Sequence, residues 1–320
     1  MQYKSDAEAI DGLAADVKQL KSEISKVIVG QDEVVELVLT SIMCDGHSLL
    51  VGVPGLAKTL LVKTIADVLD LSFKRIQFTP DLMPSDITGS EILNENRQFH
   101  FNRGPIFSHI ILADEINRTP PKTQAALLEA MQERSVTYGS NTHELDKPFF
   151  VLATQNPIEQ EGTYPLPEAQ LDRFMFNIIL TYLNFADEVQ MVKSTTTNVK
   201  PDMKKILSAH DILFYQQLIR KIPVADNVLQ YAVSLVHKTR PNTPAGTAEA
   251  NQYLQWGAGP RASQFLVLGA KCHAAFSNKY SPDIEDVKAI AAPVLRHRIV
   301  RNYKAEAEGI ETDDIIRKLL

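Results

Sequence analysis

The sequence predicts an α/β protein in which a parallel sheet lies between helices, followed by an all-α domain. Three observations support this prediction. Up to about residue 183, short apolar segments of strand length alternate with helical stretches, which is typical of a parallel sheet covered on both faces. A glycine-containing turn joins the first of these strands to a helix. Beyond residue 183 the strand signals stop and only helical patterns follow.

The composition is that of an ordinary globular protein. A length of 320 residues suits two packed domains, and 44% hydrophobic with 22% charged residues excludes a disordered chain. Lysine and arginine number 33 against 39 acidic residues, a net charge of −6, so a nucleic-acid function would need a local basic surface. Two cysteines, Cys44 and Cys272, are too few for a disulfide framework or a four-ligand zinc site, and we expect reduced, buried thiols.

The N-terminal residues show no targeting pattern. They contain no apolar core and no cleavage-site pattern, and no apolar run approaches the roughly 18 residues that span a bilayer. We therefore expect no signal peptide, no membrane insertion and a cytoplasmic location.

Two helices are predicted before the first strand. Ser5 and Glu8 fit a capping box, and apolar residues then recur at three- and four-residue spacing as far as Val27. This predicts an N-terminal helix laid on the domain surface, and a second helix is expected over 32–43. The strands expected next are 47–51, 73–78, 109–113, 149–154 and 177–180, with helices near 58–70, 122–134 and 167–174.

Two inserted β-hairpins are predicted within this core. Residues 90–101 contain apolar pairs on both sides of a polar turn, and residues 135–145 contain a second turn at 139–141. The helices expected after the core are 185–195, 208–221, 225–238, 260–277 and 283–296, the last with Ser281 as N-cap and Pro282 at its first position. The predicted domains are an N-terminal helix over 1–28, an α/β core over 29–183 and a helical domain over 184–320.

Residues 52–59, Gly-Val-Pro-Gly-Leu-Ala-Lys-Thr, stand between a strand and a helix, which is the context of a phosphate-binding loop. Backbone N–H groups of residues 55–60 are expected to cradle the β-phosphate at the positive end of the helix. Lys58 is expected to bridge the β- and γ-phosphates, and the Thr59 hydroxyl to hold Mg²⁺. The strict pattern has glycine where this chain has Ala57, so we expect that residue to keep a negative φ. The predicted nucleotide contacts in this loop are Gly52, Val53, Pro54, Gly55, Leu56, Ala57, Lys58, Thr59 and Leu60.

A second candidate element is the apolar strand that ends in Asp114 and Glu115. The carboxyl end of a parallel strand is where ligands bind in such sheets. Asp114 is expected to hold Mg²⁺ through water, and Glu115 to orient and deprotonate an attacking water. The sequence contains no Asn-Lys-x-Asp motif for reading guanine, which argues against a GTPase, and the tandem Asp-Glu argues against a small-molecule kinase.

Three further residues follow at positions that suit catalysis. Asn156 follows a predicted strand, where its amide can hold the attacking water, and Arg173 at a helix end can supply charge to a neighbouring subunit's transition state. Arg261 opens a helix of the second domain and can reach back over the phosphates. The alternatives are an Asx turn at Asn156, an ion pair between Arg173 and Asp172, and an ordinary first-turn arginine at position 261.

This ordered set of motifs resembles the AAA+ ATPases, and in particular their MoxR group. Ala57 itself is usual in the phosphate loop of that group. The resemblance covers roughly residues 25–300 in consistent order and rests on 29–32, 52–59, 78–89, 104–107, 112–118, 121–124, 127–131, 153–157, 166–174, 257–264 and 293–298.

The resemblance implies an ATP hydrolase that uses ATP and Mg²⁺. The hairpin 90–101 would be the helix-2 insert and 135–145 the pre-sensor 1 hairpin. Arg173 looks like the arginine finger, with Arg118 and Arg134 as other candidates. The other implied roles are the adenine pocket for Gly30 and Gln31, Walker A for Lys58 and Thr59, Walker B for Asp114 and Glu115, sensor 1 for Asn156 and sensor 2 for Arg261.

The resemblance also implies partners. Such proteins assemble as rings, usually hexamers, and act as chaperone-like remodellers, often with von Willebrand factor A domain proteins whose metal sites they help to load. An AAA+ nucleic-acid motor is the alternative function, but the acidic balance and the absence of a basic run between Asn94 and Arg103 argue against it. A nucleotide-gated scaffold with negligible turnover is a third possibility.

Overall fold

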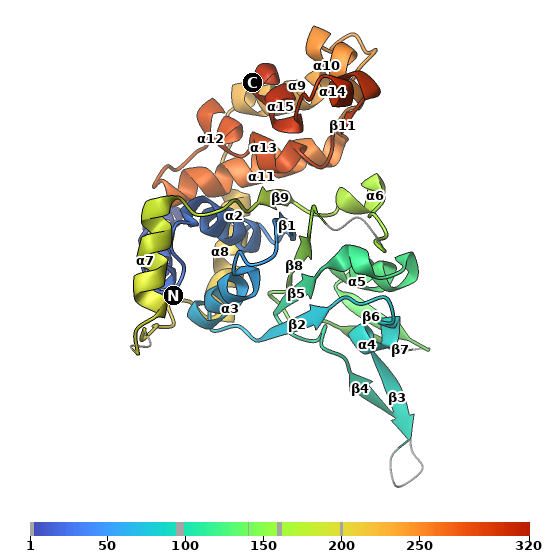
Figure 1. The fold of residues 1–320 in the computed structure, drawn as a ribbon. Helices are drawn as coiled ribbons and strands as arrows, with labels where there is room; N and C mark the ends of the chain where they lie inside the picture. Colours follow the sequence, from blue (N-terminus) through green and yellow to red (C-terminus); the bar gives the residue numbers. More distant parts are fainter. Residues whose placement is uncertain (1–2, 94–98, 140, 159–161, 199–200) are drawn as a thin grey trace.

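The computed structural model describes residues 3–93, 99–139, 141–158, 162–198 and 201–320. A five-stranded parallel sheet with helices on both faces forms its centre (Figure 1). The strand order is β2-β5-β8-β1-β9. This confirms the predicted α/β fold class. The strands are β1 (Ser48–Val51), β2 (Phe73–Gln77), β5 (Ile110–Asp114), β8 (Phe150–Gln155) and β9 (Phe176–Ile179).

The inner strands are apolar on both faces because each face carries its own hydrophobic core. Along β5, Leu112 belongs to one core and Ile111 to the other, as the two-residue period of a strand requires. The strands run parallel in register, with Val51 beside Gln155 and Ala113 beside Ala153. Their carboxyl ends therefore meet along one edge of the sheet.

One of these cores joins the N-terminal helices, the sheet and the C-terminal helices. The N-terminal helix α1 (Asp6–Ile24) packs against α3, α8 and α11, and its residue Leu13 is fully buried. Ser5 caps α1 by accepting from the Glu8 amide at 3.2 Å, but the Glu8 carboxylate accepts from the Lys4 amide, so the capping box is incomplete. Helices of this core include α2 (Asp32–Met43), α3 (Lys58–Val68), α8 (Ala209–Lys221), α9 (Asp226–Lys238) and α11 (Pro260–Phe276).

The two predicted hairpins are both present. The second of them, together with α5 (Pro121–Glu133), covers the opposite face of the sheet. The first hairpin projects away from the sheet (Figure 1). The Phe101 ring on it stacks on His143 of the second, with centroids 4.2 Å apart. The turn residues 94–98 and 140 lie outside the described residues. The elements here are α4 (Pro84–Thr88), β3 (Gly89–Leu93), β4 (Phe99–Arg103), β6 (Ser135–Tyr138) and β7 (Asn141–Glu144).

Within the described residues, the C-terminal region is helical except for a short antiparallel ribbon, which the sequence did not predict. The ribbon pairs β10 (Leu254–Trp256) with β11 (Val300–Arg301). The remaining elements are η1 (Ile116–Arg118), α6 (Glu168–Leu171), α7 (Phe185–Thr195), α10 (Ala248–Tyr253), α12 (Ile284–Ala289), α13 (Ala291–Leu295), α14 (Tyr303–Ala307) and α15 (Thr312–Leu319).

The predicted helix 283–296 is in fact two helices, α12 and α13, that meet at Ile290. Pro293 has no N–H to donate to the carbonyl four residues before it, and its ring crowds that carbonyl, so the helix breaks there. The N-cap is Asp283, which accepts from the Asp286 amide at 3.1 Å, rather than the predicted Ser281.

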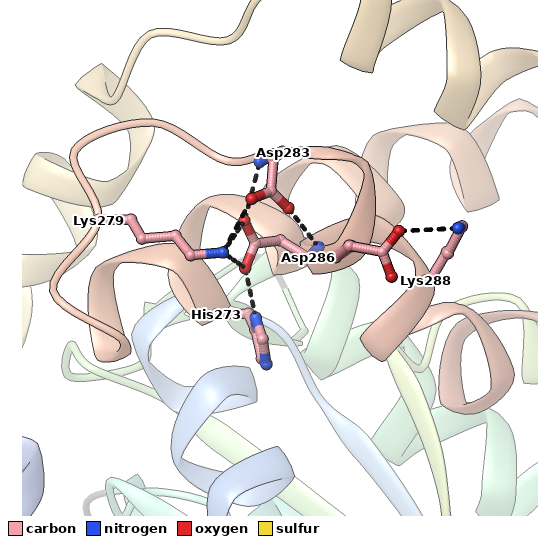
Figure 2. A network of polar contacts seen from close by, with 6 residues as sticks. His273, Lys279, Asp283, Asp286 and Lys288 are labelled. Carbon is pink, nitrogen blue, oxygen red and sulfur yellow. Dashed lines mark hydrogen bonds and ion pairs between the residues drawn. The ribbon is translucent and has the colours of Figure 1, made fainter.

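A polar network fixes the loop between α11 and α12 (Figure 2). The fully buried Asp286 carboxylate accepts from His273 Nδ1 at 2.7 Å, from Lys279 Nζ at 3.2 Å and from the Asp283 amide at 2.8 Å. Donors from helix, loop and cap thus converge on one carboxylate and satisfy it, which is what burial of a charge requires.

Candidate nucleotide-binding site

The predicted phosphate loop connects β1 to α3 at the edge where the strands end. Gly55 has φ +88° and Ala57 has φ +54°. The predicted negative φ at Ala57 was therefore wrong: the chain must turn through the left-handed region to start α3, and an alanine there costs about 1 kcal/mol relative to glycine.

The N-terminus of α3 is open to an anion. Neither a capping side chain nor an acidic residue occupies its first turn, which lies wholly within the described residues. The first N–H groups of the helix and its positive dipole end are thus available to a phosphate. Thr59 stands in this turn, half-buried.

Lys58 begins α3, and its Nζ donates to the Gly52 carbonyl at 2.6 Å. Burial lowers the pKa of Lys58, and the nearby carboxylates of Asp114 and Glu115 act in the opposite direction. The lysine is thus electrostatically close to both carboxylates. Its charged form, disfavoured by burial, would be stabilised by the negative charge of a phosphate.

Asp114 ends β5 and is 8% exposed. Its Oδ2 accepts from Arg75 Nε at 3.0 Å and Nη2 at 2.6 Å, and its Oδ1 accepts from the Thr154 hydroxyl at 2.7 Å. The Thr154 hydroxyl also accepts from the Glu115 amide at 2.8 Å. Thr154 on β8 therefore links the Asp114 carboxylate at the end of β5 to the backbone amide of the next residue, Glu115.

Glu115 has a left-handed backbone conformation, with φ +58°. Its Oε2 accepts from Gln77 Nε2 at 3.0 Å and from Arg118 Nη1 at 3.0 Å. The carboxylate is thereby held by one residue of β2 and one of η1.

The sequence reasoning missed Arg75, Gln77 and Thr154. Arg75 and Gln77 are two residues apart on β2 and so share a face of the sheet, next to β5. Their alternation along a predicted strand was a signal that could have identified them as site residues, because it means that one face of the strand meets polar partners.

Asn156 lies just beyond β8, and its Oδ1 accepts from the Ile158 amide at 3.2 Å. This is the Asx turn that was the alternative interpretation. The residue is 6% exposed and stands at the same edge as Asp114, so the structure brings it to the predicted place.

The three candidate arginine fingers occupy different surroundings. Arg173 Nη1 donates to the Leu128 carbonyl at 2.7 Å, and the residue lines a separate cavity of about 230 Å³ against α5 and α6. Arg118 contacts Glu115 within the site. Arg134 bonds Asp45 and the Phe149 carbonyl and lines a cavity against α8.

Arg261, in the first turn of α11, pairs with Asp172 Oδ2 at 3.3 Å. The ion pair between Asp172 and Arg173, which was the alternative interpretation of Arg173, does not occur within the described residues, where Asp172 pairs with Arg261 and Arg298. Instead, the structure places Arg261 next to the segment that carries Arg173, and no residue of α11 lines the cavity beside the phosphate loop.

A cavity of about 540 Å³ adjoins the phosphate loop, within the usual size range for small-molecule sites. It includes the predicted contacts Gln31, Pro54, Gly55, Leu56, Ala57 and Leu60. Gly30 lies outside it, against Asp187 of α7, with φ +70°. Lining residues that the sequence did not indicate are Val27, Ile28, Val29, Leu61, Tyr182, Leu183, Glu188, Met191 and Thr195.

These features fit a nucleotide and a divalent cation. The apolar cavity suits a base, the open α3 terminus suits phosphates, and the oxygens of Thr59 and Asp114 are hard ligands that suit Mg²⁺. Within the described residues, no group of three or more histidine, cysteine, aspartate or glutamate side chains forms a metal site of its own, and no helix is long and apolar enough to cross a membrane.

Comparisons with known proteins agree with this geometry. Residues 47–176 match the family model "ATPase family associated with various cellular activities (AAA)", and residues 247–319 match the AAA lid domain. The chain is 42% identical to Chaperone MoxR1 of Mycobacterium tuberculosis over 314 residues, covering 97% of this chain and 83% of that protein.

Two further relatives span nearly the whole chain. YeaC of Bacillus subtilis, an uncharacterized protein, is 39% identical over 100% of this chain and 96% of its own. The crystal structure of a candidate ATPase from Cytophaga hutchinsonii superposes with a TM-score of 0.91 at 46% identity, covering 98% of this chain and 95% of that one. The chain therefore belongs to the MoxR group of the AAA+ ATPases.

Proposed function

We propose that this protein hydrolyses ATP with Mg²⁺ at the edge of the sheet and uses the energy to remodel a partner protein. The observation that carries the proposal is that the open N-terminus of α3, which begins at Lys58, and the acidic residues Asp114 and Glu115 at the end of β5 stand along one edge of the sheet, where an apolar cavity of about 540 Å³ adjoins the phosphate loop. Lys58 begins α3, Asp114 ends β5 and Glu115 follows it, so a phosphate chain bound at the start of α3 would have the acidic residues on the same edge of the sheet.

Each residue has a chemical role that follows from its contacts. Lys58 supplies positive charge to the phosphates, and the amides at the start of α3 bind their oxygens. Glu115, held by Gln77 and Arg118, is positioned to take a proton from the attacking water. Thr59 and Asp114 would hold Mg²⁺, which would supply positive charge to the bound phosphates.

We further propose that the active unit is a homo-oligomeric ring, usually a hexamer in this group, in which Arg173 acts on a neighbouring copy. Arg173 lies beside α5 and α6, outside the cavity at its own phosphate loop. An arginine finger supplied in trans is a common device for stabilising the transition state of phosphoryl transfer. Size-exclusion chromatography with and without ATP tests assembly, and an ATP-insensitive monomer would contradict trans catalysis.

A protein client fits the surface better than a nucleic acid. The end of β3 exposes Ile92 and Leu93 at 49% and 57%, and the chain carries a net charge of −6. Because one relative is named a chaperone, we propose chaperone-like remodelling or maturation, including metal or cofactor loading, of a von Willebrand factor A domain protein. Salt-dependent DNA binding in fluorescence anisotropy would favour a nucleic-acid motor instead.

The decisive experiment compares Glu115→Gln with Lys58→Ala. Glu115→Gln keeps the shape and the hydrogen-bonding oxygen but removes the base, so we expect unchanged ATP affinity and a fall in kcat of about 100-fold or more. Lys58→Ala removes the phosphate contact, so binding itself should weaken. Fluorescent ATP titration and steady-state phosphate release measure both. Wild-type turnover in Glu115→Gln would contradict the proposed role, and a wild-type protein without turnover would indicate a nucleotide-gated scaffold.

A further inference from the structure

Arg298, in the turn between α13 and β11, is a buried cation that joins the C-terminal region to the core. Its side chain is 1% exposed. Its guanidinium donates to four backbone carbonyls, those of Asp172, Phe174, Met175 and Val294, at 2.5–3.1 Å. Three of these carbonyls belong to the segment that leads into β9, the same segment that carries Arg173.

The ion-pair partner of Arg298 is Asp172. Arg298 Nε donates to Asp172 Oδ1 at 2.7 Å, while Arg261 Nη1 donates to Asp172 Oδ2 at 3.3 Å. One carboxylate therefore connects the buried arginine that follows α13 with the exposed arginine of α11. The next residue along the chain is Arg173.

The charge of Arg298 persists at neutral pH. Burial lowers its pKa to about 10, and Asp172 opposes that shift. A guanidinium offers five N–H donors in a fixed plane, whereas a lysine offers three on one atom, so lysine cannot reproduce this set of contacts. The contacts thus fix the orientation of the 172–175 backbone, and they place the positive charge of Arg298 beside it.

We propose that Arg298 is a positioning residue for ATP hydrolysis, which through Asp172 holds Arg173 and Arg261 at one edge of the molecule in a fixed relation. This rests on the proposed function, in which Arg173 acts on the nucleotide of a neighbouring copy. Arg298 contacts neither the cavity nor the phosphate loop of its own chain. Its loss therefore displaces Arg173, the arginine supplied to the neighbour, and leaves ATP binding in its own subunit intact.

The experiment uses Arg298→Lys in the full-length chain. We expect unchanged affinity for fluorescent ATP, unchanged assembly by size exclusion, and a kcat about 10- to 100-fold lower, the range of loss when a catalytic group is displaced slightly. The matched control is Arg296→Lys. Arg296 also joins the two regions, through the Asn177 carbonyl at 2.5 Å and Asp313 at 2.7 Å, but does not touch Asp172. The kcat of Arg296→Lys should stay near that of the wild type.

Subunit mixing separates positioning from a general structural effect. Lys58→Ala subunits lack a working phosphate loop but carry intact arginines, so they should restore hydrolysis at the sites of Arg298→Lys neighbours. We expect the mixture to exceed the summed activities of the two variants severalfold. If Arg298→Lys folds poorly, Asp172→Asn in the same mixing assay provides the second variant.

A mixture of Arg173→Ala with Lys58→Ala tests the underlying function. If this pair complements while the Arg298→Lys pair does not, the positioning role is overturned and the trans arginine stands. If neither pair complements, the trans arginine fails and the positioning role fails with it. Equal losses of kcat in Arg298→Lys and Arg296→Lys, without complementation, would likewise overturn the proposal.

Discussion

Two carboxylate clusters in this molecule are built in opposite ways. At the phosphate edge, Asp114 and Glu115 pair with the side chains of Arg75 and Arg118, whose side chains are 47% and 44% exposed. At the joint between the core and the C-terminal helices, Asp172 pairs with Arg298, which is 1% exposed and also binds backbone carbonyls.

The difference follows from what each region must do. Ion pairs whose arginine is half exposed to water are worth about 0–1 kcal/mol, so these arginines can be exchanged for a metal ion at little cost. A buried arginine bonded to the main chain cannot be removed without leaving several polar groups unsatisfied. The phosphate edge is thus built for exchange and the joint for fixed geometry.

The largest effect is expected from breaking the joint with Arg298→Met. This change leaves the carbonyls of the 172–175 segment without their donor and Asp172 without its buried partner. We expect the free energy of unfolding to fall by about 3–5 kcal/mol. Urea denaturation followed by circular dichroism measures it. A loss below that of Arg75→Met at the phosphate edge would reverse the comparison.

An intermediate effect is expected from acid, which should act on the joint through His297. This buried histidine donates from Nε2 to the Phe174 carbonyl at 3.0 Å, and burial, followed by the charge of Arg298, holds its pKa well below the ordinary value. The folded protein keeps it neutral while the unfolded chain binds a proton below about pH 6.5. The stability it contributes is therefore present above that pH and is lost as the pH falls, by up to about 1.4 kcal/mol per pH unit.

Urea midpoints between pH 7 and pH 5 test this slope. His297→Gln should reduce the slope of unfolding free energy against pH by the contribution of one histidine. His47, also buried with a lowered pKa, provides the comparison through His47→Gln, because it binds the Met131 carbonyl and the Val151 amide in the core rather than the joint. An unchanged slope in His297→Gln would contradict the assignment.

The smallest effect is expected at the phosphate edge, from Arg75→Gln. Because the Arg75 side chain is 47% exposed, its pair with Asp114 should contribute no more than about 1 kcal/mol to stability. Because Arg75 competes with a cation for Asp114, we expect the Mg²⁺ concentration for half-maximal ATPase activity to fall, by at most about fivefold. Arg75→Lys keeps the charge and is the control. A higher Mg²⁺ requirement in Arg75→Gln would mean that Arg75 supports the site instead.

The sheet was predictable because its signals are local. Each inner strand is a short apolar run between loops. All five strands of the sheet, including the two edge strands, were predicted within two residues of their observed ends. The β10–β11 ribbon was not, since strands of three and two residues carry no periodicity. The break at Ile290 was missed although Pro293 marks it in the sequence.

The site was predictable where its residues adjoin a strand end. Lys58, Asp114, Glu115 and Asn156 all follow predicted strands closely, and their meeting at one edge follows from parallel register. The partners that hold them were not predictable, because Arg75 and Asp114 are 39 residues apart and Arg298 and Asp172 are 126 apart. Whether Asn156, Arg173 and Arg261 act as implied stays a prediction.

The sequence by itself determined the alternation of strand and helix, the phosphate loop and the two acidic residues at a strand end, because these depend on neighbouring residues and on the geometry of a parallel sheet. Only the tertiary structure decided the φ of Ala57 and the choice of Arg298 and Arg261, rather than Arg173, as partners of Asp172. The physical reason is that a buried charge pairs with whichever donor the packing brings within reach, and packing joins segments that are distant in the chain.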